Sequence, residues 1–303
     1  MIARLQRMML GTSLLLVVCA AWRWWPQSPG LLAASVLGLL ALNPLALGLE
    51  LLIMVQVNRR DLAPRASGRQ LWRAWVTEVQ ASSRVFGLWQ PFQADAFGDR
   101  LHSGGVPEQR GVLLIHGYFC NRGVWTPWMR HLTGSGRPFV ALSLEPAFGS
   151  IDELAGQVDR AVTALTEATG RAPVVVAHSM GGLVVRAWWR HSVARGDAPR
   201  VHHVITLGTP HQGTWLARWA HTPNGRQMRL ASPWLQTLAA EEPAERAQAF
   251  SCFYSNCDNV VFPAHTATLP GAKNHLVPGL PHVALATDPG VRQQVMALIE
   301  TMD

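Results

Sequence analysis

The 303-residue chain contains little charge and almost no lysine. Only 15% of its residues are charged, whereas soluble globular domains carry about 25%. A single lysine, Lys273, accompanies 25 arginines, and 49% of the residues are hydrophobic. This composition excludes an intrinsically disordered chain, and four cysteines in so long a chain exclude a small disulfide-rich scaffold. No cysteine and histidine spacing matches a zinc site, and no glycine-rich phosphate loop follows an expected strand.

The apolar surplus lies in the first 57 residues. Residues 8–21 carry no charge, and the tryptophan-rich segment 22–26 closes this run. A second run, Leu31 to Val57, is long enough to cross a bilayer with some tilt. Asn43-Pro44 predicts a kink, and we expect Glu50 to lie near the headgroups or to face the partner helix. The sequence therefore predicts a transmembrane hairpin in residues 1–60, with helices at about 8–25 and 31–57.

An alternative for the first apolar run is a cleavable signal peptide. Residues 1–7 form a basic start, and Val18-Cys19-Ala20 loosely matches a small-residue cleavage site. In that case a single helix would remain as the membrane segment.

Arginines near the helix ends predict the orientation of the hairpin. Two arginines precede the first helix and one lies in the connection, whereas five follow the second helix: Arg59, Arg60, Arg65, Arg69 and Arg73. By the positive-inside rule, both ends of the hairpin and everything after residue 60 lie on the cytoplasmic side. We therefore expect a multi-pass protein of a bacterial-type cytoplasmic membrane. Residues 1–60 hold +4 of the formal charge of +7, so the basic character indicates topology, and no nucleic-acid partner is expected.

Residues 61–104 form a juxtamembrane segment. Within it, residues 70–89 place Leu71, Trp75, Val79 and Phe86 at near-helical spacing among basic side chains. This pattern is typical of a helix lying on anionic lipid, and equally of a helix packed on the following domain. The sequence leaves both alternatives open.

Strands and helices alternate in residues 105–303. Short apolar runs predict strands at 111–115, 139–144, 172–178, 201–207, 249–255 and 272–277. Helices are expected at 124–132, at 150–169 after the capping box Ser150–Glu153, at 180–194 and at 289–302. This alternation predicts an α/β fold with a mostly parallel sheet covered on both faces. Residues 211–248 interrupt it as a helical, tryptophan-rich insertion, which is either an extra packing layer or a cap over the substrate pocket.

The strongest chemical signal is the segment Ala177-His178-Ser179-Met180-Gly181, which lies between an expected strand and an expected helix. Small residues two positions before and after a serine permit the sharp turn on which a serine nucleophile is raised above a sheet edge. Ala177 stands where the common motif has glycine. We expect Ser179 to be the nucleophile.

A serine nucleophile needs a base and an orienting acid, which follow it in the order acid, then histidine. Asp258 lies in a loop after a long strand, and His282 lies in a turn-rich loop before the final helix. Their rivals are His275, inside the expected last strand, and Asp288, which is placed as a helix cap before Pro289. We expect Asp258 and His282 to complete the triad.

Stabilisation of the tetrahedral oxyanion requires two backbone N–H groups. Met180 follows the nucleophile and supplies one, and the loop after residue 115 supplies the other, with Tyr118 preferred over Phe119. Phe119, Trp125 and Trp215 are candidate substrate-binding side chains, although core packing explains the first two equally well.

These residues together resemble the α/β-hydrolase superfamily, and within it bacterial triacylglycerol lipases and related esterases. The resemblance rests on His116-Gly117, the segment 177–181, Leu207-Gly-Thr-Pro-His-Gln-Gly213, Asp258 and His282, and it covers about residues 105–303. It implies ester hydrolysis through an acyl-serine intermediate, with no metal or organic cofactor. It does not extend to the hairpin.

Three functions are compatible with this sequence. The first is a membrane-anchored esterase or lipase acting on an apolar acyl ester. The second is an acyltransferase that uses the same triad with an alcohol acceptor, and the third is a membrane scaffold whose hydrolase domain only binds.

Cys252 and Cys257 are too far apart in an extended strand end to pair, so both are expected as free thiols.

Overall fold

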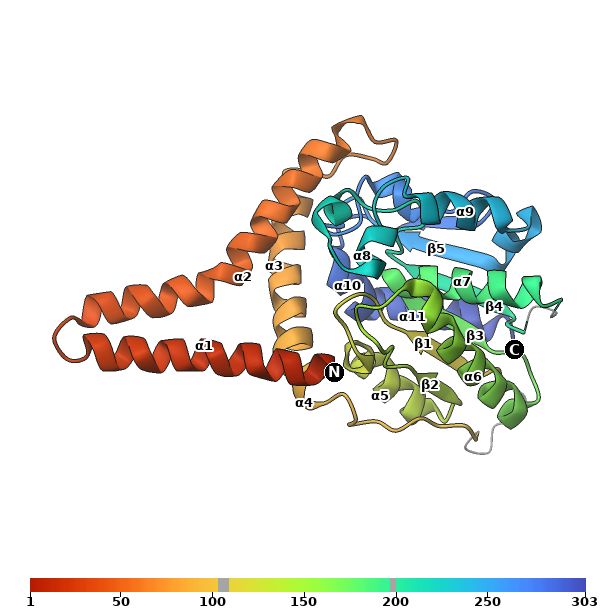
Figure 1. The fold of residues 1–303 in the computed structure, drawn as a ribbon, viewed down its shortest axis with the longest axis horizontal. Helices are drawn as coiled ribbons and strands as arrows, with labels where there is room; N and C mark the ends of the chain where they lie inside the picture. The colour runs from red at the N-terminus through yellow and green to blue at the C-terminus, as the bar shows by residue number, and fades with distance from the viewer. Residues whose placement is uncertain (103–108, 197–199) are drawn as a thin grey trace.

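Two long helices at the N-terminus extend away from the rest of the molecule. The computed structural model describes residues 1–102, 109–196 and 200–303, and so the expected domain boundary at 104/105 lies outside the described residues. Helices α1 (Ile2–Trp24) and α2 (Pro29–Val57) form an antiparallel hairpin that projects from the α/β part of the chain (Figure 1). Both are long and apolar enough to cross a membrane. At 1.5 Å per residue, the 23 residues of α1 span about 35 Å, comparable to a bilayer core.

Both helices begin earlier than the apolar pattern predicts. Helix α1 includes residues 2–7, of which Arg4 and Arg7 are basic. Its first turns pack on the rest of the molecule, where Ile2 and Gln6 are buried. Gln6 is buried there, and its Nε2 donates to Gln90 Oε1 over 2.8 Å. Helix α2 bends along its length (Figure 1), and Pro44, inside the helix, provides the reason because proline lacks the N–H of a helical hydrogen bond.

Helix α3 (Gly68–Arg84) lies between α2 and the α/β domain (Figure 1). It begins with a capping box made by Ser67 and Gln70. Its buried residues face α2 and the domain, and Trp75 Nε1 donates to the carbonyl of Pro44 in α2 over 2.8 Å. Of the two alternatives for this segment, the structure shows the helix packed on the domain. A π-helical turn, 85–89, and the short α4 (Gln90–Phe92) follow.

Within the described residues, the domain is built on a six-stranded sheet with the order β2-β1-β3-β4-β5-β6, in which each pair of neighbouring strands is parallel. The strands are β1 (Val112–Ile115), β2 (Phe139–Ala141), β3 (Val174–His178), β4 (His203–Leu207), β5 (Phe250–Tyr254) and β6 (Lys273–Leu276). Strand β2 is shorter than the expected run 139–144, because the chain leaves the sheet edge after Ala141. The predicted fold class is confirmed.

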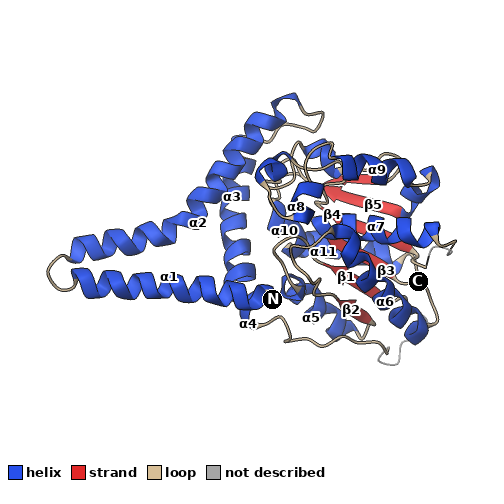
Figure 2. Ribbon diagram, in the orientation of Figure 1, coloured by secondary structure: helices blue, strands red, loops and turns tan. Residues whose placement is uncertain are grey.

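Helices cover both faces of the sheet, as Figure 2 shows. Alternate residues of β1 point to opposite cores: Leu113 and Ile115 pack in one, Val112 and Leu114 in the other. The first core contains α6 (Ile151–Thr169) and α7 (Met180–Ala194). The second contains α5 (Thr126–Ser135), α10 (His282–Thr287) and α11 (Pro289–Glu300). Burial on both faces explains why these strands read as continuous apolar runs.

The insertion after β4 consists of short helical pieces. A 3₁₀ turn at Trp215–Trp219 is followed by α8 (Pro223–Gln227), α9 (Pro233–Glu241) and a further 3₁₀ turn, Ala244–Ala249. Leu235 and Leu238 of α9 join the core on the α7 side. The insertion therefore contributes packing, and its first part reaches the cavities described below.

Candidate active site

Ser179 lies on a strained turn between β3 and α7. Its backbone adopts φ 54° and ψ −130°, a conformation that side-chain-bearing residues rarely occupy. The turn is held from two sides, because Ser179 N donates to the Leu207 carbonyl over 2.9 Å and Thr209 Oγ1 donates to the Ser179 carbonyl over 2.8 Å. Both partners belong to the segment 207–213 singled out in the sequence. The expected strand–turn–helix setting of the serine is thus present.

Close backbone approach explains the small residues around Ser179. A Cβ on Gly181 would lie 2.5 Å from the Ile115 carbonyl oxygen, and one on Gly117 would lie 2.6 Å from Ser179 Cβ. Gly208 has φ 57°, and a Cβ there would meet Asp258 Oδ2 at 2.9 Å. Each position therefore requires glycine for a steric reason. Ala177, the departure from the common motif, is completely buried in β3.

His282 and Asp258 form a buried pair. His282 Nδ1 lies 2.9 Å from Asp258 Oδ2, and the other carboxylate oxygen accepts the N–H groups of Val260 and Val261 over 2.9 and 2.7 Å. These bonds fix the carboxylate, and the carboxylate in turn orients the imidazole. With Nδ1 engaged by Asp258, Nε2 is the ring nitrogen left for another partner. The rivals have other roles: His275 is in β6 stacked on Phe253, and Asp288 caps α11.

Nearby carboxylates offset the effect of burial on the pKa of His282. Burial opposes the charged imidazolium and lowers its pKa, but Asp258, Glu78 and Glu50 act in the opposite direction, and the net result is a pKa raised above the usual value. Neighbouring His178 behaves differently. Burial, and then the charge of His282, hold the pKa of His178 well below its usual value, so this ring is neutral. Its Nε2–H donates to the His282 carbonyl over 3.0 Å.

Two cavities meet at Ser179. One, of about 240 Å³, is lined by Ser179 and His282 together with residues of α2 and α3. The other, of about 150 Å³, is mostly apolar and is lined by residues of the insertion, including Leu216, Ala217 and Met228. Tyr118, Ser179 and Val260 line both cavities. Ser179 therefore borders one cavity on the side of the insertion and another on the side of the hairpin.

The remaining predicted site residues lie in different places. Met180 is the first residue of α7 and Tyr118 lines both cavities, whereas Phe119 has φ 57° and its ring contacts Phe86 and Phe148. Trp125 is fully buried in the core, where it packs edge-on against His178. Trp215 packs on Phe262 beside α2 residues. Neither tryptophan is among the residues that line the two cavities.

Three polar residues at the site were not predicted from the sequence. Glu78 of α3 accepts the N–H groups of Val283 and Ala284, the two residues that follow His282. Asn259 Oδ1 accepts the His282 N–H, and Asn259 Nδ2 donates to Glu50 Oε2 of α2. Glu50 thus faces the α/β domain rather than the partner helix α1. One feature of the sequence could have pointed to the two glutamates, because each lies far along the chain from other acidic residues. Glu50 is the single acidic residue in 1–60, and Glu78 is the single one between Asp61 and Asp95.

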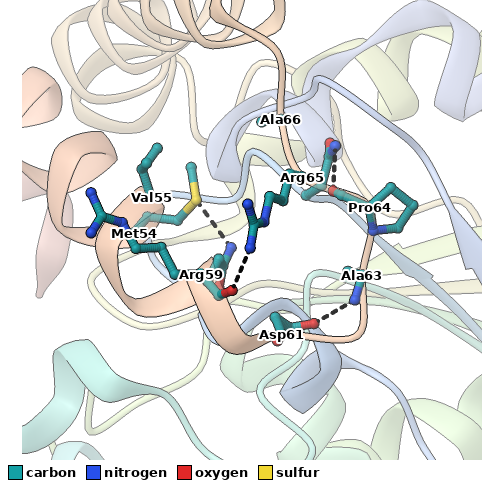
Figure 3. Close-up of a pocket in the computed structure, with 10 residues that line it drawn as sticks. Met54, Val55, Arg59, Asp61, Ala63, Pro64, Arg65 and Ala66 are labelled. Carbon is teal, nitrogen blue, oxygen red and sulfur yellow. Dashed lines mark hydrogen bonds between the residues drawn. The ribbon is translucent and has the colours of Figure 1, made fainter.

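A further cavity lies away from this site. It measures about 70 Å³ and is formed by the end of α2, the following loop and Asn256 (Figure 3). There Arg65 donates to the Arg59 carbonyl, as Figure 3 shows. None of the triad residues lines it. Within the ranges that the structure describes, no three His, Cys, Asp or Glu side chains are grouped as a metal site requires, and the four cysteines are free thiols.

The fold and this site define a class of protein. Residues 112–299 match the model of the alpha/beta hydrolase family, which covers more than half of the chain. The protein belongs to the alpha/beta hydrolase family. No curated protein matches the chain in a sequence comparison.

Solved structures with the same fold include bacterial lipases. The mature form of lipase BlEst2 from Bacillus licheniformis superposes with a TM-score of 0.56 at 17% identity, covering 64% of this chain and 94% of that one. Its propeptide form gives 0.56 at 16% identity, over 67% of this chain and 52% of that one. Phospholipase PlaB from Legionella pneumophila gives 0.50 at 14% identity, over 65% and 60%. At these identities the likeness establishes the fold.

The raised pKa of His282 predicts the pH dependence of Ser179 reactivity. The imidazole accepts the serine proton only when it is neutral, so labelling of Ser179 by a fluorophosphonate should increase with pH. We expect the midpoint to lie above about 6.5, the usual histidine value. Initial labelling rates of the full chain in detergent, measured between pH 5 and 9, check this. A midpoint below that value would contradict the placement of three carboxylates around the ring.

Proposed function

We propose that the protein is a membrane-anchored serine hydrolase that cleaves carboxylic esters of lipids or other apolar acyl compounds. The observation that carries the proposal is the meeting of two cavities at Ser179, which lies on a strained turn beside the buried His282–Asp258 pair. This arrangement combines a nucleophile, a base and an orienting acid with room for both halves of an ester. The names of the lipases with the same fold agree with this chemistry.

The reaction proceeds in two halves. His282 Nε2 removes the Ser179 proton while Oγ attacks the ester carbonyl carbon, and the N–H groups of Met180 and Tyr118 stabilise the resulting oxyanion. The tetrahedral intermediate expels the alcohol, which takes its proton from the His282 imidazolium, and an acyl-serine remains. Water then attacks with the same base, and the carboxylic acid leaves as Ser179 regains its proton. Asp258 stabilises the imidazolium in both halves.

The cavity on the insertion side suits the acyl group. Its lining is mostly aliphatic, and transfer of an apolar chain from water into it is favourable. The hairpin-side cavity, which contains Glu78, Asn259 and Ser82, suits the more polar alcohol half. The hairpin favours an amphiphilic compound as the substrate. The large exposed apolar side chains of α1 and α2 require lipid around them, so the site would lie close to a bilayer.

Replacement of the nucleophile is the direct test of this activity. Ser179→Ala should reduce hydrolysis of p-nitrophenyl esters by at least about 10³-fold, because the attacking oxygen is removed while binding remains. The readout is the release of nitrophenol by the full chain in detergent, and Ser135→Ala, on the exposed side of α5, is the matched control.

Retention of the parent rate in Ser179→Ala would overturn the proposal. Analysis of products in the presence of glycerol separates hydrolysis from acyl transfer: we expect free acid as the main product. A majority of glycerol ester would assign the triad to an acyltransferase instead.

We also propose that the hairpin crosses the cytoplasmic membrane twice and that the catalytic domain lies on the cytoplasmic side. Both ends of the hairpin contact the domain: the amino group of Met1 pairs with Glu145, and Asn58 Oδ1 accepts the Ala264 N–H over 3.2 Å. A hairpin whose two ends contact the same domain must enter and leave the membrane on the side where that domain lies. The arginine distribution indicates that this side is the cytoplasm.

Cysteine labelling tests this topology. In a Cys19→Ser background, Gln27→Cys in the exposed turn between α1 and α2 should react with an impermeant maleimide added to bacterial spheroplasts. Glu300→Cys, exposed at the end of α11, should react only after lysis. The reverse pattern would place the catalytic domain outside, and labelling of both sites without lysis would contradict a spanning hairpin.

A further inference from the structure

Two segments outside the hydrolase core hold the part of the chain that carries the triad histidine. Glu78 of α3 is 1% exposed, and its Oε1 and Oε2 accept the Val283 N–H over 2.9 and 3.1 Å. Oε2 also accepts the Ala284 N–H over 3.3 Å. These two N–H groups belong to the first turn of α10, which begins at His282. The carboxylate of Glu78 therefore fixes the backbone next to His282.

A second link to the same residue comes from the membrane hairpin. The His282 N–H donates to Asn259 Oδ1 over 3.1 Å, and Asn259 Nδ2 donates to Glu50 Oε2 over 2.7 Å. Asn259 is 1% exposed, and Glu50 lines the same cavity as Ser179. A short chain of hydrogen bonds thus runs from α2 through the acid loop to the backbone of the triad histidine.

Burial of Glu78 is costly unless a positive charge forms beside it. An ionised carboxylate loses its hydration on burial, and two backbone N–H groups return only part of that free energy. Burial raises the pKa of Glu78 to about 7, and the hydrogen bonds and the charge of His282 oppose this rise. The imidazolium that His282 forms when it takes the serine proton supplies the missing charge.

We propose that Glu78 is a positioning residue for the base His282, assisted by Glu50 through Asn259, so that α2 and α3 complete the active site. Glu78 holds the backbone of the histidine turn, whereas Asp258 holds the ring. Its negative charge also stabilises the imidazolium that forms in both halves of the reaction. Helices α2 and α3 thus contribute to the active site, and the hairpin that contains α2 also anchors the enzyme. This inference rests on the proposed function only through the pair Ser179 and His282.

The groups that face His282 define how its titration can be altered. Asp258 comes from the loop after β5, Glu78 from α3 and Glu50 from α2, and all three favour the charged ring. His178 at the end of β3 is neutral, and its Nε2–H donates to the carbonyl oxygen of His282. Removal of the Glu78 charge withdraws a favourable interaction with the imidazolium, so the ring should lose its proton at lower pH.

The test is the pH profile of fluorophosphonate labelling of Ser179 in the full chain in detergent, which needs no natural substrate. In Glu78→Gln, the amide oxygen can still accept one N–H while the charge is gone. We expect the acid limb to move to lower pH by about half a unit to one unit, with a lower plateau. In Glu78→Asp, the charge remains but the side chain is one methylene shorter. We expect an unmoved limb and a lower plateau.

The matched control is Glu167→Gln, which removes a carboxylate from the exposed face of α6 and should leave both the limb and the plateau unchanged. A profile of Glu78→Gln with a lower plateau but an unmoved limb would overturn the proposal, because a merely structural role lowers labelling equally at every pH. Should Glu78→Gln not fold, Glu50→Gln carries the test. Its limb is expected to move in the same direction by a smaller amount, and an unmoved limb would overturn the proposal.

Failure of this inference is distinguishable from failure of the proposed function. Absence of Ser179 labelling in the parent protein at every pH would contradict the proposed function. Normal labelling of the parent with an unmoved limb in Glu78→Gln would contradict only the role of Glu78.

Discussion

The strained backbone at Ser179 is the constraint on which the rest of the site depends. A residue with φ 54° between a parallel strand and a helix persists only when its surroundings hold it, and hydrogen bonds from the β4 end hold it here. The same turn brings β1 so close that Gly117 and Gly181 have no room for a Cβ. It also places the serine at the edge where the carboxyl ends of all the parallel strands meet, which is where Asp258 and His282 arrive from later strands.

The hairpin and α3 add a layer that the hydrolase core lacks. Residues of α2 and α3 form one side of the larger cavity at Ser179, so the segments that carry the exposed apolar surface also border the site. Under the proposed function, attachment and catalysis would therefore share these segments. Under that function, a lipid substrate would reach Ser179 beside these apolar segments.

Much of the fold could be predicted from local patterns. The strands β1, β3 and β4 read as apolar runs because they are buried on both faces, and Ser150 and Asp288 form the helix caps expected of them. The nucleophile and its partners could be proposed because the turn around Ser179 and the order of acid and histidine leave a local pattern. The structure brings His282 and Asp258 to 2.9 Å, as that order predicts.

Contacts between distant segments could not be predicted in this way. Glu78 is 205 residues from the backbone group that it holds, and nothing near either end specifies the pairing. Trp125 and Trp215 read as candidate pocket residues because an aromatic side chain suits a core and a pocket equally well, and only packing distinguishes the two. The start of α1 differs from its apolar run for the same reason, because the contact between Gln6 and Gln90 extends the helix towards the N-terminus. Helix α2 begins at Pro29, two residues before its apolar run, because proline suits the first turn of a helix.

The proposed mechanism requires Ser179 to carry an acyl group during turnover. The most direct measurement is mass spectrometry of the full chain, quenched in acid within milliseconds of mixing with a short-chain p-nitrophenyl ester and then digested. We expect the peptide containing Ser179 to gain the mass of the acyl group, and this adduct to decay as free acid appears. Continued release of nitrophenol with no adduct on Ser179, or with the adduct on another residue, would rule out an acyl-Ser179 intermediate.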